Sequence, residues 1–206
     1  GNYRNIVVSD QSGKSNIMSR LQKYGIKIDK NDPKVQSLLN EVKDREFAGY
    51  SYDGADASFE LLARRLLGEI PKYLTISKYD VSVKRDSKDK INSFAKAHIV
   101  VDGKEIICEG SGNGPVNALD NAIRSNVDKV GKYSKYLKDL KLVDYKVRIL
   151  NTGTEAITRV SIESTDSKGK NWFTIGVSTN IIEASFKALI DSLDYKLFKD
   201  NAPASN

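Results

Sequence analysis

A glycine-rich stretch at residues 110–117, which runs directly into a helical pattern, is the part of this sequence best suited to bind a ligand. Gly112 and Gly114 can take positive φ angles and carry no side chain, so a ligand or a second backbone can approach them closely. Pro115 suits the first position of a helix. The unpaired N–H groups and the dipole of such a helix start attract a carboxylate or a phosphate. The alternative is a tight strand-to-helix turn that binds nothing.

Two nucleotide-binding motifs are incomplete. Pro115 and Val116 stand where the dinucleotide fingerprint G-x-G-x-x-G needs its last glycine. Residues 12–16 contain a Gly-Lys-Ser sequence, but Val8 occupies the position of the first glycine of a phosphate-binding loop. We therefore interpret residues 12–16 as a capped helix start and not as a nucleotide site.

Catalytic and metal-binding residues are scarce. His98 is the only histidine, which excludes the usual zinc sets and the Ser-His-Asp type of triad. Strand alternation predicts that His98 faces solvent, whereas Cys108, the only cysteine, is predicted to be inert core. A single cysteine also excludes an internal disulfide framework. The sequence thus predicts no catalytic residue and no metal ligand.

A basic segment at residues 129–141 interleaves lysines with Tyr133 and Tyr136, as surfaces that bind single-stranded nucleic acid do. Its basic residues are interrupted by Asp128 and Asp139, and no RNA-binding signature is present. Over the whole chain 33 basic and 27 acidic residues give a net charge of +6, and they are interspersed. We predict a basic linker and no nucleic-acid partner, with a nucleic-acid-binding β-α module as an alternative.

The composition predicts an ordinary globular protein, because 39% of the 206 residues are hydrophobic and 29% are charged. No apolar run has the length of a membrane span, and no signal peptide is recognisable. We therefore predict no membrane partner and a cytoplasmic location. The chain starts with Gly1 and not with Met, so we also expect a fragment of a longer protein.

Three helices are predicted within residues 1–70, after a short strand at residues 6–8. The first ends at Gly25, the second opens at Asp32 and Pro33, and the third is capped by Asp56. Their predicted apolar faces consist of Ile17, Leu21 and Tyr24, then Val35, Leu38, Leu39, Val42 and Phe47, then Phe59, Leu62, Leu66 and Leu67. We interpret residues 1–70 as a small helical linker subdomain that ends near Pro71.

Residues 71–206 contain an internal repeat of two β-β-β-α units, at 73–131 and 142–197. The apolar residues of the first strand return at an offset of 66, whereas the middle strand matches at 63, with Ala97 on Val160. Val116, Leu119, Ile123, Val127 and Val130 are predicted to line the first helix. The predicted fold is α+β, with two pseudo-twofold-related units, one sheet from each, and the helices packed across them.

An apolar wall is predicted on the first strand of the second unit. Alternation puts Tyr145 and Ile149 on one face, close to Val160 of the next strand, and Leu142 extends the same surface. Against the glycine turn, this wall could hold the apolar side chain of an amino acid whose charged groups meet the helix start. The alternative is ordinary sheet core.

Residues 112–122, 142–150 and 180–185 resemble the C-terminal regulatory domain of the 2-isopropylmalate synthase and citramalate synthase family, and residues 49–62 are most similar to the citramalate synthase branch. The resemblance implies a homodimer with a feedback site for a branched-chain amino acid at its interface, isoleucine first and leucine as the alternative. The site residues that this implies are Gly112, Asn113, Gly114, Pro115, Val116, Asn117, Leu142, Tyr145, Ile149, Val160, Asn180 and Ile181.

The resemblance also implies that a catalytic barrel, absent here, condenses acetyl-CoA with a 2-oxo acid, pyruvate in the citramalate branch, and uses a divalent metal. This chain is expected to hold no cofactor and to be inactive alone. In the family the region of residues 12–16 approaches the partner's active site, but Ser19 stands where some members place a catalytic tyrosine. A free-standing amino-acid-binding module is the remaining alternative.

Overall fold

The computed structural model describes residues 2–206, and for residues 2–11, 127 and 152 it describes the backbone only. The described chain has three opening helices and then two units of three strands and a helix, and these units form separate antiparallel sheets. The predicted α+β fold is confirmed. The elements are α1 (Asn2–Lys23), α2 (Pro33–Phe47), α3 (Asp56–Leu66), β1 (Thr75–Arg85), β2 (Ile91–Val101), β3 (Lys104–Gly112), α4 (Pro115–Arg124), η1 (Val127–Lys129), η2 (Gly131–Tyr133), α5 (Ser134–Leu137), β4 (Lys141–Thr152), β5 (Glu155–Thr165), β6 (Asn171–Ser178) and α6 (Ile181–Lys199).

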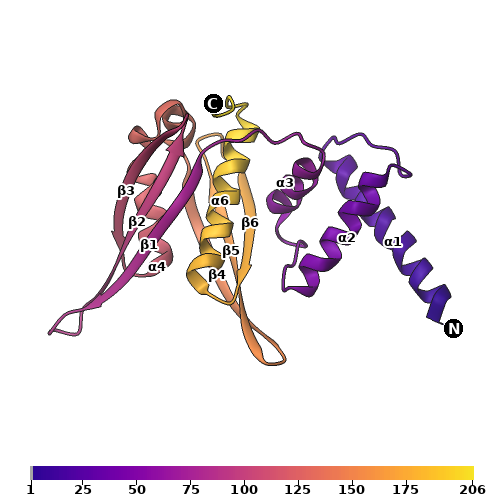
Figure 1. The fold of residues 1–206 in the computed structure, drawn as a ribbon, viewed down its shortest axis with the longest axis horizontal. Coiled ribbons are helices and arrows are strands. Elements are labelled where there is room, and N and C mark those ends of the chain that lie inside the picture. Colours follow the sequence, from indigo (N-terminus) through magenta and orange to yellow (C-terminus); the bar gives the residue numbers. More distant parts are fainter. Residues whose placement is uncertain (1) are drawn as a thin grey trace.

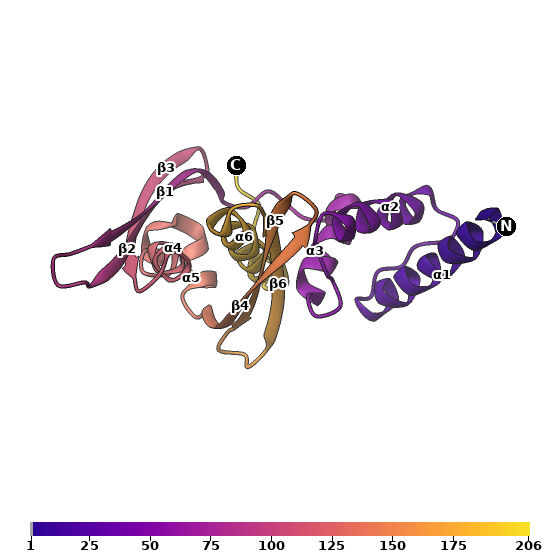
Figure 2. The same ribbon diagram turned by 90° about the horizontal axis from the view of Figure 1, so that it is seen from below.

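The helices α4 and α6 lie between the two sheets, while α1, α2 and α3 extend beyond the second sheet (Figures 1 and 2). Both helices can approach their sheets because glycines stand below them. A Cβ on Gly110 would lie 2.3 Å from the backbone N of Ala122, and one on Gly176 would lie 2.0 Å from the carbonyl O of Ala184. The central core joins both units and consists of Ala95, Ala118, Leu119, Ala122, Val160, Ile162, Ala184, Ala188 and Leu189.

The strand register supports the repeat but corrects its offset. Both first strands have a register irregularity, and the two lie 66 positions apart, at Ile76/Lys78 and Leu142/Asp144. Tyr79 lies opposite Ala97 and Tyr145 lies opposite Ile162, so the middle strands correspond at an offset of 65. The predicted offset of 63 was wrong by two residues. Alternation has a period of two, so a slip of two keeps the same face inward and leaves the pattern unchanged.

The opening helices largely follow the predicted signals. Asp32 caps α2 by accepting from the Lys34 N–H at 2.9 Å, and Pro33 is its first residue. The core of this part consists of Ile17, Leu21, Ile26, Val35, Leu38, Leu39, Val42, Tyr52, Ala55, Phe59 and Ala63, joined by Ile175 of β6.

Five details in this part were predicted wrongly. Residues 6–8 belong to α1 and form no strand, because three apolar residues without a pairing strand continue the helix instead. Residues 12–16 lie inside α1 and are not a capped helix start, because the helix already begins at Asn2. Ala55 is the N-cap of α3, and Asp56 is its first residue. Phe47 is 91% exposed at the last residue of α2, beyond the packed part of its stripe, and Leu66 is exposed at the end of α3.

α3 is tied closely to the second unit. The Ser58 hydroxyl donates to Asp191 on α6 at 2.8 Å and accepts from the Ile175 N–H at 2.9 Å. Arg65 bonds both Asp191 and Asp194, at 3.0 and 2.9 Å. Burial raises the pKa of the Asp194 carboxyl to about 6, although Arg65 beside it acts in the opposite direction. Because α3 packs on β6 and α6, the domain division near residue 70 stays a prediction.

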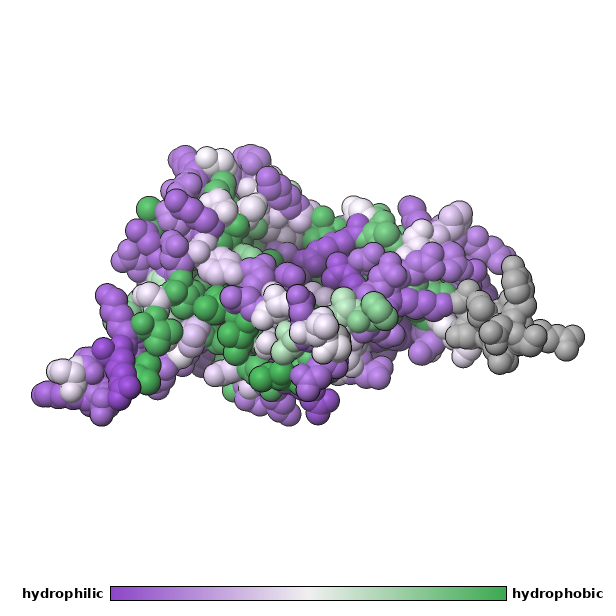
Figure 3. Space-filling model, turned by 60° about the horizontal axis from the view of Figure 1, so that its bottom comes forward, coloured by the Kyte–Doolittle hydropathy of each residue, from purple (hydrophilic) through white to green (hydrophobic). Residues whose placement is uncertain are grey.

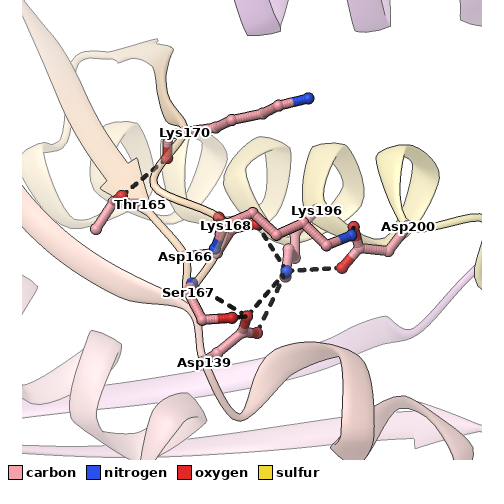
Figure 4. Close-up of polar contacts among 8 residues, drawn as sticks. All are labelled: Asp139, Thr165, Asp166, Ser167, Lys168, Lys170, Lys196 and Asp200. Atoms are coloured by element: carbon pink, nitrogen blue, oxygen red, sulfur yellow. Dashed lines mark hydrogen bonds and ion pairs between the residues drawn. The ribbon is translucent and has the colours of Figure 1, made fainter.

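A buried lysine fastens the far end of α6. The Lys196 ammonium, on a side chain that is only 2% exposed, lies 2.6 Å from Asp200, 2.8 Å from Asp166 and 3.2 Å from Asp139 (Figure 4). Burial alone would lower the pKa of Lys196, but these three carboxylates raise it above its usual value. Lys196 thus joins α6 to the β5–β6 turn and to the segment before β4.

The segment between the two units is packed into the structure. Tyr133 is fully buried, and its hydroxyl donates to the Pro203 carbonyl at 2.8 Å. A ring in that position is not available to stack on a base. α4 is also shorter than predicted, since it ends at Arg124 and Val127 falls in η1.

His98 corrects the prediction of a solvent-facing residue. It lies on the outer face of the first sheet, as alternation required, but it is buried and its Nδ1 is 2.6 Å from Oε1 of Glu105. It lies between Lys78 and Ile107 of the flanking strands. Cys108 is buried as predicted, and burial raises the pKa of its thiol.

Candidate functional site

The start of α4 has no side-chain cap among the described residues. Gly114, its N-cap, is extended with φ −148° and ψ 169°, and no side chain accepts from the first N–H groups of the helix. The side chains of Asn117 and Asn121 bond each other at 2.8 Å, and Asn121 also donates to the Ser111 carbonyl at 2.8 Å. The helix start therefore presents backbone donors that a small carboxylate could accept from.

The glycines of this turn act differently from the prediction. Neither Gly112 nor Gly114 has a positive φ, so that expectation was wrong. Gly112 is required by proximity, because a Cβ there would lie 2.8 Å from Oδ1 of Asn117 and 2.9 Å from the backbone N of Ala118. A Cβ on Gly114 would meet nothing within 4 Å. Gly110 and Gly112 therefore allow α4 to pack closely on β3, whereas the space around Gly114 is open.

The start of α6 is the counterpart of this turn, and it is capped. Oδ1 of Asn180 accepts from the N–H groups of Ile182 and Glu183, at 2.8 and 3.2 Å. Asn180 and Ile181 therefore stand at the other helix start, where two of the backbone donors already have a partner.

The predicted wall lies on β4. Tyr145 and Ile149 lie opposite Ile162 and Thr158 on the face that turns toward the helices. They are 43% and 70% exposed, because α6 covers β5 and β6 and leaves the edge strand uncovered. Val160, opposite Val147, is completely buried in the central core. Of the predicted wall, Tyr145 and Ile149 are thus accessible and Val160 lies beneath.

The beginning of the wall lies beside α4. Leu142 lines a small cavity together with Asp120 and Arg124 of α4, so the beginning of β4 lies beside that helix. Tyr79, the counterpart of Tyr145, reaches Glu183 in the first turn of α6. Asn117 is the counterpart of Glu183 at the offset of 66, so the repeat predicts that Tyr145 turns toward it.

Figure 3 shows apolar side chains gathered on the two-sheet part of the molecule, next to the polar tip of the β1–β2 hairpin. The starts of α4 and α6 and the tips of the β1–β2 and β4–β5 hairpins all lie at the lower end of the two-sheet part in Figure 1. The exposed large apolar residues on the helix-side faces of β1 and β4 are Val83, Tyr145, Val147 and Ile149. Such a row on an edge strand is suited to cover by another surface.

Residues 53–197 match the family model of the LeuA allosteric (dimerisation) domain. The chain belongs to this family. The match takes in α3, both β-β-β-α units and nearly all of α6, so the family resemblance that the sequence predicted is confirmed. It begins within the predicted linker subdomain, in keeping with the packing of α3 on β6.

Curated relatives of this domain family are longer enzymes. The (R)-citramalate synthases of Aquifex aeolicus and Geobacter sulfurreducens are each 44% identical to this sequence over 97% of the chain. A probable 2-isopropylmalate synthase of Methanopyrus kandleri is 25% identical over 92% of it. The chain spans 38% of the length of the first two relatives, and it corresponds to their C-terminal region.

None of the helices in the part that the structure describes combines the length and the apolar run needed to cross a bilayer. The described residues also hold no group of three or more His, Cys, Asp or Glu side chains placed to bind a metal ion.

Two residues near the site were missed at the sequence level. Glu183 bonds Tyr79, and the Phe186 ring stacks on the same tyrosine with centroids 4.7 Å apart. The internal repeat could have identified them, because at the offset of 66 Glu183 corresponds to Asn117 and Phe186 corresponds to Asp120 of α4.

Proposed function

We propose that this chain is the regulatory part of a citramalate synthase-type acyltransferase, and that two copies bind isoleucine between them as a feedback inhibitor. The full-length protein would condense acetyl-CoA with pyruvate in the cytoplasm. Its divalent metal and its catalytic residues would belong to the part that lies outside this chain. The chain alone should therefore bind and transmit, and not catalyse.

One combination of features carries this proposal: β4 has an exposed apolar row, and the start of α4 at the same end of the two-sheet part has no side-chain cap. An amino acid needs donors for its carboxylate and an apolar surface for its side chain, and this end of the molecule offers both. On a single chain that surface is open to solvent, since Asn117, Tyr145 and Ile149 are all exposed. A second copy would supply the missing cover, as the family's dimerisation role supports.

Isoleucine is our first choice of effector and leucine the second. Leu142 and Ile149, with Val160 buried beneath them, make a branched surface that suits a side chain branched at Cβ. An apolar pocket separates two such isomers by only about 1–3 kcal/mol, so leucine should bind too, but more weakly. The relatives support the same order, since the two citramalate synthases named above share 44% identity with this chain and the probable 2-isopropylmalate synthase named above shares 25%.

Thermal melting with added amino acids tests the proposal. A ligand at 100 times its dissociation constant stabilises the folded state by about 2.7 kcal/mol, which is visible as a rise in melting temperature. Isoleucine should raise it more than leucine does. Tyr145→Ala and Ile149→Ala should reduce the rise, whereas Ile107→Ala, which removes an exposed apolar side chain from the outer face of the first sheet, should not.

The outcomes separate the alternatives. A larger shift with leucine would support a 2-isopropylmalate synthase type of regulatory domain. If neither amino acid shifts the melting of the chain, the regulatory proposal fails.

A further inference from the structure

The fold contains two related walls, and their states differ. Tyr79 on β1 and Tyr145 on β4 occupy equivalent places, each three residues after the start of the same strand irregularity. Tyr79 is half-buried, its ring stacks on Phe186 at an interplanar angle of 28°, and its hydroxyl donates to Oε2 of Glu183. On β1, Tyr79 is therefore covered by side chains of α6, while Val83, the counterpart of Ile149, stays exposed.

The wall on β4 has no such cover from α4. The counterparts of Glu183 and Phe186 are Asn117 and Asp120. Asp120 turns to its own helix, where its Oδ2 accepts from Nε of Arg124 at 2.7 Å, and Asn117 accepts from Asn121. Neither residue provides a ring, and Tyr145 stays 43% exposed.

The starts of α4 and α6 also differ, in whether a side chain caps them. Asn180 caps α6 with its own side chain, whereas its counterpart Gly114 has no side chain to cap α4. The unit with the capped start of α6 thus covers Tyr79, whereas Tyr145 stays exposed and its related helix, α4, has an uncapped start. An amino acid needs an apolar wall for its side chain and free backbone N–H groups for its carboxylate. Only the unit pair of β4 and α4 leaves both of these free.

We propose that Phe186 and Glu183 close the second of these two related walls, so that each chain binds one branched-chain amino acid and not two. This inference rests on the proposed function, because it assumes that the open wall is the amino-acid site. Phe186 occupies the volume that the apolar side chain of a ligand would need, and Glu183 takes the Tyr79 hydroxyl. The fold holds both side chains next to Tyr79, so their effective concentration there is high. A free amino acid would have to displace them to bind.

Isothermal titration calorimetry with isoleucine tests this through the number of sites. The unchanged chain should bind one isoleucine per chain. The variant with both Phe186→Ala and Glu183→Asn, which removes the ring and copies the residue of the first unit, should bind two, the second more weakly. Phe198→Ala removes a ring from the opposite end of the same helix and should keep one site.

Each outcome has one meaning. No binding by the unchanged chain contradicts the proposed function itself. Two sites in the unchanged chain, or one site in a folded double variant, overturn the inference and leave the proposed function intact. If circular dichroism shows that the double variant is unfolded, Phe186→Val, which keeps an apolar side chain without the ring, takes its place, and a single site in that variant overturns the inference as well.

Discussion

Gly110 and Gly114 stand four positions apart before α4, and the contacts that a side chain would make separate their roles. A Cβ on Gly110 would lie 2.3 Å from the backbone N of Ala122, and backbone cannot move aside cheaply. We expect Gly110→Ala to lower the free energy of unfolding by about 1–3 kcal/mol. Gly114→Ala should change it by less than about 0.5 kcal/mol, since Gly114 is extended and its surroundings are open. Urea unfolding measures both, and equal losses would contradict this account of the turn.

Single residues were predictable where a local rule decides. Asp32 and Pro33 open α2 as their types require, and Pro115 opens α4. The burial of His98 was not predictable, because strand alternation gives the face of a residue but not its contacts on that face, such as the one with Glu105. Phe47 fits the apolar stripe of α2 by spacing, and only the tertiary arrangement shows that nothing covers it.

At the scale of elements, Lys196 is the residue that fixes the far end of α6. Replacing it with methionine would leave Asp139, Asp166 and Asp200 without their shared cation, and breaking a buried ion pair costs about 3–5 kcal/mol. Lys168→Met is the matched control, because Lys168 also bonds Asp200 but is largely exposed, so its loss should cost at most about 1 kcal/mol. Chemical unfolding compares the two variants. A Lys196→Met chain as stable as the control would show that the cluster does not fasten α6.

The repeat of elements was readable from the sequence, and its register was not. Apolar alternation identified six strands and two helices, but it could not separate an offset of 63 from one of 65. The hydrogen-bonded partners decide between them, and they depend on the irregularity near the start of each first strand. The packing of α3 on β6 also lay outside any pattern, because it joins segments more than a hundred residues apart.

At the scale of the whole molecule, the candidate site is built from elements that one chain leaves open. The sequence identified the glycine turn and the β4 wall, and the structure places Leu142 beside α4. The sequence also grouped Asn180 with that site, although Asn180 belongs to the other helix start. A single chain could not reveal what covers Tyr145 and Ile149, since the cover we propose comes from a second copy.

Sedimentation at a series of isoleucine concentrations tests the central claim most directly. If the effector binds between two copies, each bound isoleucine stabilises the dimer and not the monomer, so the dissociation constant of the dimer must fall as isoleucine is added. Alanine, which lacks the branched side chain, should leave it unchanged. We predict a species of twice the chain mass that persists to lower protein concentration with isoleucine than without. A strictly monomeric chain that binds isoleucine fully, or a dimer whose dissociation constant does not depend on isoleucine, would contradict the account.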